Sequence, residues 1–453
     1  MTDQSPFPTD LIMKKITIKG FRGLSQPIEI NLSRDATFLI GRNGTGKTTL
    51  INIVSDCLQC RYQSLMAAPF DSAEVIFESN ANKNSVLTVT KNYDKDGDVE
   101  EIRFFFADLE NETPSFDHSI KSRLYRRSED YGGPASQRRI LNEFSKRFRL
   151  TWLALNRAAG IAKSLSEPAG DLDAKLEHSF QKLATYFTRL DSRFSVELQK
   201  FQQEWFMSLL VSSKKENALS VVQKIDPDEE DRQIREMLSG IGIRPNDYSS
   251  KVERHIQAIT NLSSSKLQHL HQKDEVERIT DSYDISKLHF LVEQWLELQK
   301  TKAEIYSTKE KFVAIANSML YKKTLSVDAG NKVILQKPGS EKLENMAEKD
   351  LRAYRKEILI GRISQPGEIK YSDLSSGEKQ LLIFLAETAL RSGSPYIFIA
   401  DEPELSLHIE WQEKLVPVIL ELSPEAQIFF ATHSPDIVNG YRKNVFSMED
   451  FSI

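Results

Sequence analysis

Gly41-Arg42-Asn43-Gly44-Thr45-Gly46-Lys47-Thr48 fits the pattern G-x-x-x-x-G-K-[ST] at every position. The apolar run Ala36–Ile40 precedes it. A helical pattern over Lys47–Gln59 follows, with one apolar face formed by Leu50, Ile51, Val54 and Leu58. A strand, a glycine-rich turn and a helix in this order predict a loop whose backbone N–H groups surround a phosphate. The sequence therefore predicts a nucleoside triphosphate site at the start of this helix.

The residues of this loop have separate predicted tasks at the phosphates. Glycines permit the tight backbone turn, the Lys47 ammonium neutralises the β- and γ-phosphates, and the Thr48 hydroxyl is a ligand of Mg²⁺. The predicted nucleotide-binding residues of the loop are Asn43, Gly44, Thr45, Gly46, Lys47, Thr48 and Thr49. Taken alone, the loop indicates a triphosphate and no particular reaction.

A second apolar strand, Tyr396–Ala400, ends in two adjacent acids, Asp401 and Glu402. Acids at the end of a buried strand need solvent or a metal ion. If this strand lies beside the strand of the phosphate loop, Asp401 reaches the same Mg²⁺ as Thr48. Glu402 then faces the γ-phosphate and can polarise a water for attack. The alternative is a solvated strand end before a turn.

Leu374-Ser375-Ser376-Gly377-Glu378-Lys379-Gln380 precedes the amphipathic helical pattern Leu381–Leu390. We call Leu374–Gln380 the signature stretch. Ser375 can contact an anion, and Gly377 permits close approach at a helix N-terminus. The same residues can form a capping box, in which Ser375 and Glu378 satisfy each other's backbone N–H groups. Both interpretations hold together, because capping and anion binding use the same groups.

The composition is that of an ordinary soluble chain. Its net charge is −5, so a nucleic-acid contact would need a local basic patch. The two cysteines, Cys57 and Cys60, exclude a disulfide framework, and a zinc site lacks a second ligand pair. Because no secretory signal and no apolar run of membrane-spanning length occur, we expect a cytoplasmic protein without membrane contact.

The chain is long enough for about two to three domains. Residues 1–160 are predicted to form an N-terminal lobe with the phosphate loop and a β-rich region at 72–107. Residues 161–300 are predicted to form a helical insertion, and residues 301–453 a C-terminal lobe in which helices and strands alternate as in a parallel sheet. The insertion contains a near-heptad apolar series, which favours either a helical lid on the core or a short coiled-coil-like arm.

Residues 121–149 form a basic segment in this acidic chain, with two interleaved tyrosines, Tyr125 and Tyr131. Clustered basic and aromatic residues are typical of a nucleic-acid surface, and they would also suit an acidic partner protein. A solvated helical face is the alternative.

Taken in order, these motifs resemble those of the ABC-type ATPases, which include SMC proteins, double-strand-break-repair ATPases and the OLD (overcoming lysogenisation defect) proteins. The Leu-Ser-Ser-Gly-Glu form resembles SMC-like heads. Phe21–Leu24, Glu402–His408 and Ala431–Pro435 are most similar to the OLD-like branch. The resemblance implies an α/β ABC-type P-loop head with a mixed or parallel sheet and flanking helices, an antiparallel β-subdomain and a helical insertion.

The resemblance also implies functional residues. ATP and Mg²⁺ are the implied cofactors, with Thr48 and Asp401 as metal ligands and Glu402 and His433 as catalytic residues. The chain is expected to form dimers, or higher oligomers of dimers, in which one copy's signature residues contact the ATP of the other; these residues are Ser375, Ser376 and Gly377. No glutamine occupies the loop where the family usually has one, and Asn156 or Arg157, after the strand-like Leu150–Leu155, is the predicted substitute.

Many OLD-like proteins are ATPase subunits of bacterial anti-phage systems. OLD nucleases carry a TOPRIM domain after the strand that leads to His433, whereas few residues follow Pro435 here. We therefore expect a separate nuclease partner of the HNH type, as in the two-gene Septu systems that this chain resembles. The alternatives are an SMC-like DNA-repair or DNA-tethering ATPase, a nucleotide-gated scaffold with negligible hydrolysis, and a transporter subunit. The long insertion and the signature form disfavour the transporter.

Overall fold

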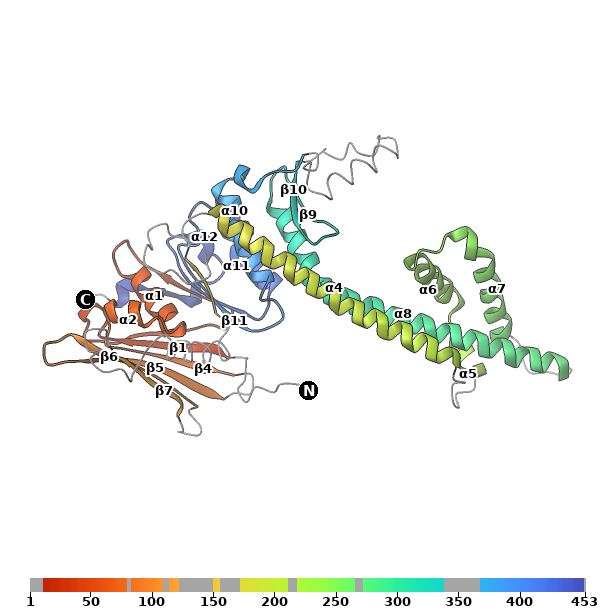
Figure 1. Cartoon of the computed structure of the whole chain (residues 1–453), viewed down its shortest axis with the longest axis horizontal. Helices are drawn as coiled ribbons and strands as arrows, with labels where there is room; N and C mark the ends of the chain where they lie inside the picture. The colour runs from red at the N-terminus through yellow and green to blue at the C-terminus, as the bar shows by residue number, and fades with distance from the viewer. Residues whose placement is uncertain are drawn as a thin grey trace. The chain divides into compact units, whose positions relative to one another are not determined.

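The structure is a computed structural model of the 453-residue chain (Figure 1). It describes residues 11–79, 83–108, 114–121, 150–154, 172–210, 218–264, 272–337 and 367–451. The chain divides into two compact units, one of Met1–Thr185 with Thr308–Ile453, the other of Tyr186–Ser307. The phosphate loop, the signature stretch and the Asp401-Glu402 pair all belong to the first unit, so the candidate site is contained in it.

A parallel sheet carries the functional loops of the first unit. In the described residues its strands follow the order β13 (Val445–Ser447), β3 (Ala36–Ile40), β12 (Ala426–Ala431), β11 (Tyr396–Asp401) and β8 (Leu150–Ala154). Every residue of β11 and β12 is buried, as expected for parallel strands covered on both faces. The parallel arrangement predicted from the alternation of helices and strands is therefore confirmed.

The strand of Asp401 does not lie beside the strand of the phosphate loop, so the condition stated for Asp401 to reach the Mg²⁺ of Thr48 is not met in that form. β12 separates the two strands, since Ala431 pairs with Leu39 of β3 on one side and with Asp401 of β11 on the other. β11 and β12 are apolar runs of equal length. Their residues alone do not tell which of them pairs with β3, because strand order depends on how the intervening helices cross the sheet.

Helices cover this sheet. α1 (Lys47–Leu58) packs against β11 and β12, and α11 (Ile409–Leu422) packs against β12 and α10 (Ser376–Ala389) (Figure 1). Because α1 lies across both central strands, its first turn comes close to the end of β11 even though β11 and β3 are not neighbours.

An antiparallel sheet forms the second layer of this unit, as predicted for the β-rich region. In the part of the chain that the structure describes, its order is β2 (Ile28–Asn31), β1 (Ile12–Lys19), β4 (Ser72–Glu78), β5 (Asn84–Tyr93), β6 (Val99–Asp108) and β7 (Pro114–Lys121). The buried Gln427 of β12 joins the two sheets: its side-chain amide donates to the Met13 carbonyl and accepts from the Met13 N–H, each at 2.7 Å. A continuous apolar core lies between them and includes α1.

Two long helices and a hairpin complete the first unit. α4 (Leu172–Leu210) begins in it and α8 (Gln272–Met319) ends in it, followed by a hairpin of β9 (Thr324–Val327) and β10 (Val333–Gln336). Asn317 closes the corner between α8 and β9, since its side chain bonds both the N–H and the carbonyl of Leu325 at 2.7 and 2.9 Å. The end of α8 is thus firmly connected to the hairpin.

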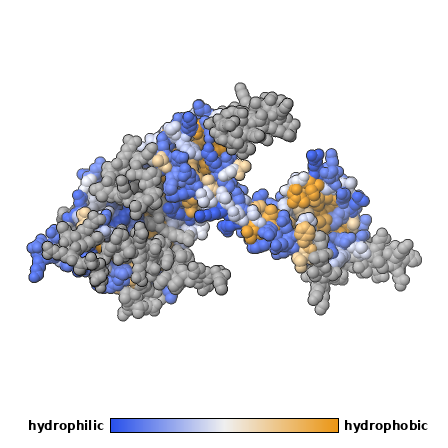
Figure 2. Space-filling model, in the orientation of Figure 1, coloured by the Kyte–Doolittle hydropathy of each residue, from blue (hydrophilic) through white to orange (hydrophobic). Residues whose placement is uncertain are grey.

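The second unit contains the rest of α4 and α8, together with α5 (Ala218–Val222), α6 (Pro227–Gly240) and α7 (Pro245–Ser264). Within it α4 and α8 run side by side in opposite directions, with Phe194 against Tyr306 and Phe201 against Trp295 (Figure 1). Exposed apolar side chains such as Phe206 remain, and Figure 2 shows hydrophobic patches over this unit. The pair has the antiparallel pattern of a short coiled coil.

Candidate functional site

The phosphate loop turns from β3 into α1 at a position that only glycine fits. Gly46 is the N-cap of α1 with φ of 100°, and a Cβ built there would lie 3.0 Å from the Phe21 ring. Any side chain would therefore strain the backbone and crowd the ring. Arg22 also supports the loop, donating from Nη1 to the Gly44 carbonyl at 2.8 Å. The predicted strand, loop and helix are all present.

The polar residues of the loop lie around this turn. The Thr45 hydroxyl donates to the Arg42 carbonyl at 2.9 Å and helps to close the loop. Asn43 and Thr48 are exposed, and Thr49 is half-buried in the first turn of α1. The exposed groups are open to a ligand that approaches the helix N-terminus.

Lys47 lies within the loop and among acids. Its Nζ donates to the carbonyls of Gly41 and Arg42 at 2.8 and 3.1 Å, although the residue is only 5% exposed. Burial lowers the pKa of Lys47, and the negative charges of Glu402, Asp401 and Glu404 oppose that shift. The ammonium is therefore held where a polyphosphate would meet it.

Thr48 and Asp401 meet at the end of β11. Burial raises the pKa of Asp401 to about 6, and hydrogen bonding by the nearby Thr48 side chain acts in the opposite direction. Oxygen Oδ1 of Asp401 is buried and has no hydrogen-bond partner within the described part of the chain. A buried carboxylate oxygen without a donor is costly, and a hard cation would satisfy it. These two residues therefore fit Mg²⁺.

Glu402 and His433 face each other across the ends of β11 and β12. The Nε2 atom of His433 lies 3.8 Å from Oε1 of Glu402. Glu402 itself has φ of 49°, an uncommon conformation for a residue with a side chain, and its N–H donates to the Ala431 carbonyl at 2.8 Å. Strained backbone of this kind is frequent at functional sites.

Glu404 belongs to the same group of acids, although the sequence did not predict it as a site residue. Its Oε1 accepts from the His433 N–H at 2.6 Å, and its Oε2 is buried without a partner among the described residues. In the sequence, only the spacing Glu402-Pro403-Glu404 indicates that Glu404 could lie at the site. The contact to His433 joins positions far apart in the sequence, so the motif alone does not reveal it.

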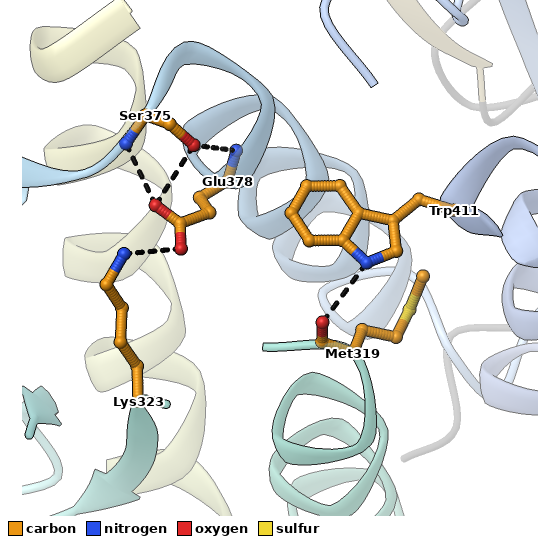
Figure 3. A network of polar contacts seen from close by, with 5 residues as sticks. All are labelled: Met319, Lys323, Ser375, Glu378 and Trp411. Atoms are coloured by element: carbon orange, nitrogen blue, oxygen red, sulfur yellow. Dashed lines mark hydrogen bonds and ion pairs between the residues drawn. The ribbon is translucent and has the colours of Figure 1, made fainter. Parts of the chain in front are cut away.

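The signature stretch forms the capping box that the sequence predicts. Ser375 is the N-cap of α10, accepts from the Glu378 N–H, and donates from both its N–H and its hydroxyl to Glu378 Oε2 at 2.9 and 3.0 Å (Figure 3). Lys323, just before β9, forms an ion pair with the other oxygen of Glu378. Burial alone would raise the pKa of Glu378, but hydrogen bonds from Lys323 and Ser375 lower it.

The N-terminus of α10 packs on the loop that follows β11. A Cβ on Gly377 would lie 2.3 Å from the Ser406 carbonyl oxygen, and Gln380 donates to the Pro403 carbonyl at 3.2 Å. Trp411 bonds the last residue of α8 through the Met319 carbonyl at 3.1 Å (Figure 3). Ser375 and Ser376 are exposed, and in the described residues they make no hydrogen bond or ion pair with the phosphate loop.

Some predicted residues fall outside or away from this site. Asn156, Arg157 and nearly all of the basic segment 121–149 lie outside the described residues. Cys57 and Cys60 are buried thiols of the core, and the described residues include no cluster of three or more His, Cys, Asp or Glu able to hold a metal. No helix in the described part of the chain is long and apolar enough to cross a membrane.

Comparison with known proteins identifies the class of this fold. Residues 12–438 match the family described as AAA ATPase domain. The chain is also similar to the Smc head domain with an extended coiled coil from Pyrococcus furiosus, bound to the C-terminal domain of ScpA, at 12% identity over 96% of this chain and 93% of that one, with a TM-score of 0.43. The SMC head domain from Thermotoga maritima is similar at 12% identity over 96% and 94%, with a TM-score of 0.38. The family match and the strand order confirm the predicted α/β P-loop ATPase head.

Proposed function

Because this chain belongs to the AAA ATPase domain family, we propose that it binds ATP with Mg²⁺ and hydrolyses it to ADP and phosphate. The observation that carries the proposal is the meeting of Thr48 and Asp401 beside Lys47, with one buried carboxylate oxygen left without a partner among the described residues. Thr48 and Asp401 would hold Mg²⁺, which neutralises phosphate charge when bound.

The other residues supply the hydrolytic chemistry in this proposal. Glu402 accepts a proton from the attacking water, and its distance of 3.8 Å from His433 leaves both side chains able to face one γ-phosphate. Lys47 and the N–H groups of the glycine-rich loop bind the phosphate oxygens. The direct test is phosphate release by the purified protein with Mg²⁺ and ATP, and no release above that of a Lys47→Ala control would contradict hydrolysis.

We further propose that each ATP lies between two copies of the chain. Ser375 and Ser376 are exposed at the N-terminus of a 14-residue helix, which is an anion-binding position. In the described residues they make no hydrogen bond or ion pair with their own phosphate loop, and we infer that a second copy's ATP is their ligand. Head-to-tail pairing of two copies would complete two sites at once.

Lys323 is predicted to stabilise the signature stretch of this composite site through its ion pair with Glu378. Lys323→Met leaves the buried Glu378 without its cation. The capping box should then loosen, and kcat for ATP should fall about tenfold, equivalent to about 1.4 kcal/mol. The ATP affinity of the phosphate loop should stay within about twofold, because the signature residues act in the other copy.

The matched control for this prediction is Lys322→Met, which removes an exposed neighbouring lysine. Steady-state phosphate release and a titration with a fluorescent ATP analogue measure the two effects separately. Equal kcat values for Lys323→Met and Lys322→Met would show that the ion pair does not support the signature stretch.

The biological role that we propose is the ATPase subunit of a bacterial anti-phage complex, whose ATP state controls a separate HNH-type nuclease as in Septu systems. Its support is the OLD-like form of Glu402–His408 and of Ala431–Pro435. Affinity purification of the tagged chain, expressed with its neighbouring genes, tests the role. A stoichiometric nuclease is the expected result, and self-association alone would contradict it.

The antiparallel pairing of α4 and α8 inside Tyr186–Ser307 favours a second candidate, an SMC-like ATPase of DNA repair or tethering. DNA that stimulates ATP hydrolysis by the purified chain, in the absence of any nuclease, would distinguish this candidate. ATP binding without any phosphate release would instead favour a nucleotide-gated scaffold.

A further inference from the structure

Two loops run beside each other at the carboxyl end of the parallel sheet. The first, Glu402–Leu407, follows β11, and the second, Thr432–Ser434, follows β12. The Thr432 N–H donates to the Leu39 carbonyl at 3.0 Å, which continues the pairing with β3 by one residue. The next N–H, that of His433, donates to the side chain of Glu404 instead, at 2.6 Å. The Glu404 side chain is therefore the acceptor for the first backbone N–H beyond the pairing of β12 with β3.

Side chains of α10 and α11 hold the backbone of the loop that contains Glu404. Gln412 of α11 donates to the Leu407 carbonyl at 2.9 Å and accepts from the Ser434 hydroxyl at 2.7 Å, so it bonds both loops. Gln380 of α10 donates to the Pro403 carbonyl. With the loops held in this way, the Glu404 side chain needs no rearrangement to reach the His433 N–H.

The charge of Glu404 is part of the site. Its electrostatic influence reaches both Lys47 and Asp401. Hydrogen bonds to a charged acceptor are stronger than neutral ones, so the carboxylate is an effective anchor for the His433 N–H. The anchored residue is His433, whose side chain lies 3.8 Å from Glu402.

We propose that Glu404 is a positioning residue for ATP hydrolysis, which fixes the backbone of His433 and thereby the distance between the His433 imidazole and Glu402. This inference rests on the proposed hydrolytic function. Glu404 acts through His433 and not on the reacting atoms, so its effect should depend on that imidazole.

Three variants separate the effect of the hydrogen bond between Glu404 and the His433 N–H from the effect of the Glu404 charge. Glu404→Ala removes the acceptor and should lower kcat about tenfold while KM for ATP stays within about twofold. Glu404→Gln keeps an oxygen that accepts from the His433 N–H and should retain kcat within about threefold. Glu413→Ala, an exposed glutamate on α11, is the control and should match the unaltered chain.

A double-mutant cycle tests whether Glu404 acts through His433. In a His433→Ala background, Glu404→Ala should lower kcat by less than about twofold more, because the imidazole to be positioned is already gone. Independent losses that multiply in the double variant would overturn the inference. A loss in Glu404→Gln as large as in Glu404→Ala would also overturn it, because charge and not anchoring would then matter.

Hydrogen exchange measures the anchor without any hydrolysis. The His433 amide should exchange at least about tenfold faster in Glu404→Ala than in the unaltered chain, with little change in Glu404→Gln. If the unaltered chain shows no hydrolysis that depends on Glu402, the proposed function fails. If it hydrolyses ATP and Glu404→Ala matches it in kcat and exchange, only the present inference fails.

Discussion

Lys47→Ala is expected to weaken the binding of Mg-ATP by about a hundredfold or more and to remove hydrolysis with it. The Lys47 ammonium donates to the carbonyls of Gly41 and Arg42 in the loop. Its charge also balances Asp401, Glu402 and Glu404, whose negative charges all act on it. Without Lys47, these acids would repel the phosphates that we propose the loop binds.

A titration with a fluorescent ATP analogue in the presence of Mg²⁺ measures this effect. Lys95→Ala, on the exposed turn between β5 and β6, removes the same charge away from the site and serves as the control. A dissociation constant for Lys47→Ala within a factor of about three of that control would contradict the assignment of this loop to ATP.

Glu402→Gln is expected to lower kcat by roughly a hundredfold to a thousandfold while ATP binding persists. Gln keeps the size of the side chain and can occupy the same backbone conformation, so the structural change is small. What it removes is the carboxylate that we propose accepts a proton from water. Because the ATP-bound state would no longer turn over, dimers should accumulate when ATP is added.

Phosphate release and light scattering after size-exclusion chromatography measure the two consequences. Asp401→Asn is an informative comparison. It removes a proposed metal ligand and should therefore also lower the affinity of the site for Mg²⁺. Hydrolysis by Glu402→Gln at the unaltered rate would show that another group is the base.

The sequence predicts those parts of the site that depend on local residues. The phosphate loop follows from eight consecutive positions, and the Ser375–Glu378 capping box follows from a spacing of three on one helix. Both structures arise from bonds between near neighbours in the chain, so the pattern of residues contains nearly all the information that is needed.

The rest of the site depends on contacts between distant parts of the chain. The position of β12 between β3 and β11 is a property of the whole sheet, and the residues of the strands alone do not indicate it. Arg22 reaches the Gly44 carbonyl, Lys323 reaches Glu378, and Glu404 reaches the His433 N–H. None of these pairs has a sequence spacing that a helix or a strand would impose.

We propose that one ATP is bound by two copies of this chain. The structure of Glu402→Gln with ATP and Mg²⁺, determined by crystallography or electron microscopy, tests this arrangement. We predict that a γ-phosphate held by Lys47 of one copy contacts Ser375 and the backbone of Gly377 of the other copy. A fully ordered ATP bound by a single chain, with Ser375 facing solvent, would contradict the claim.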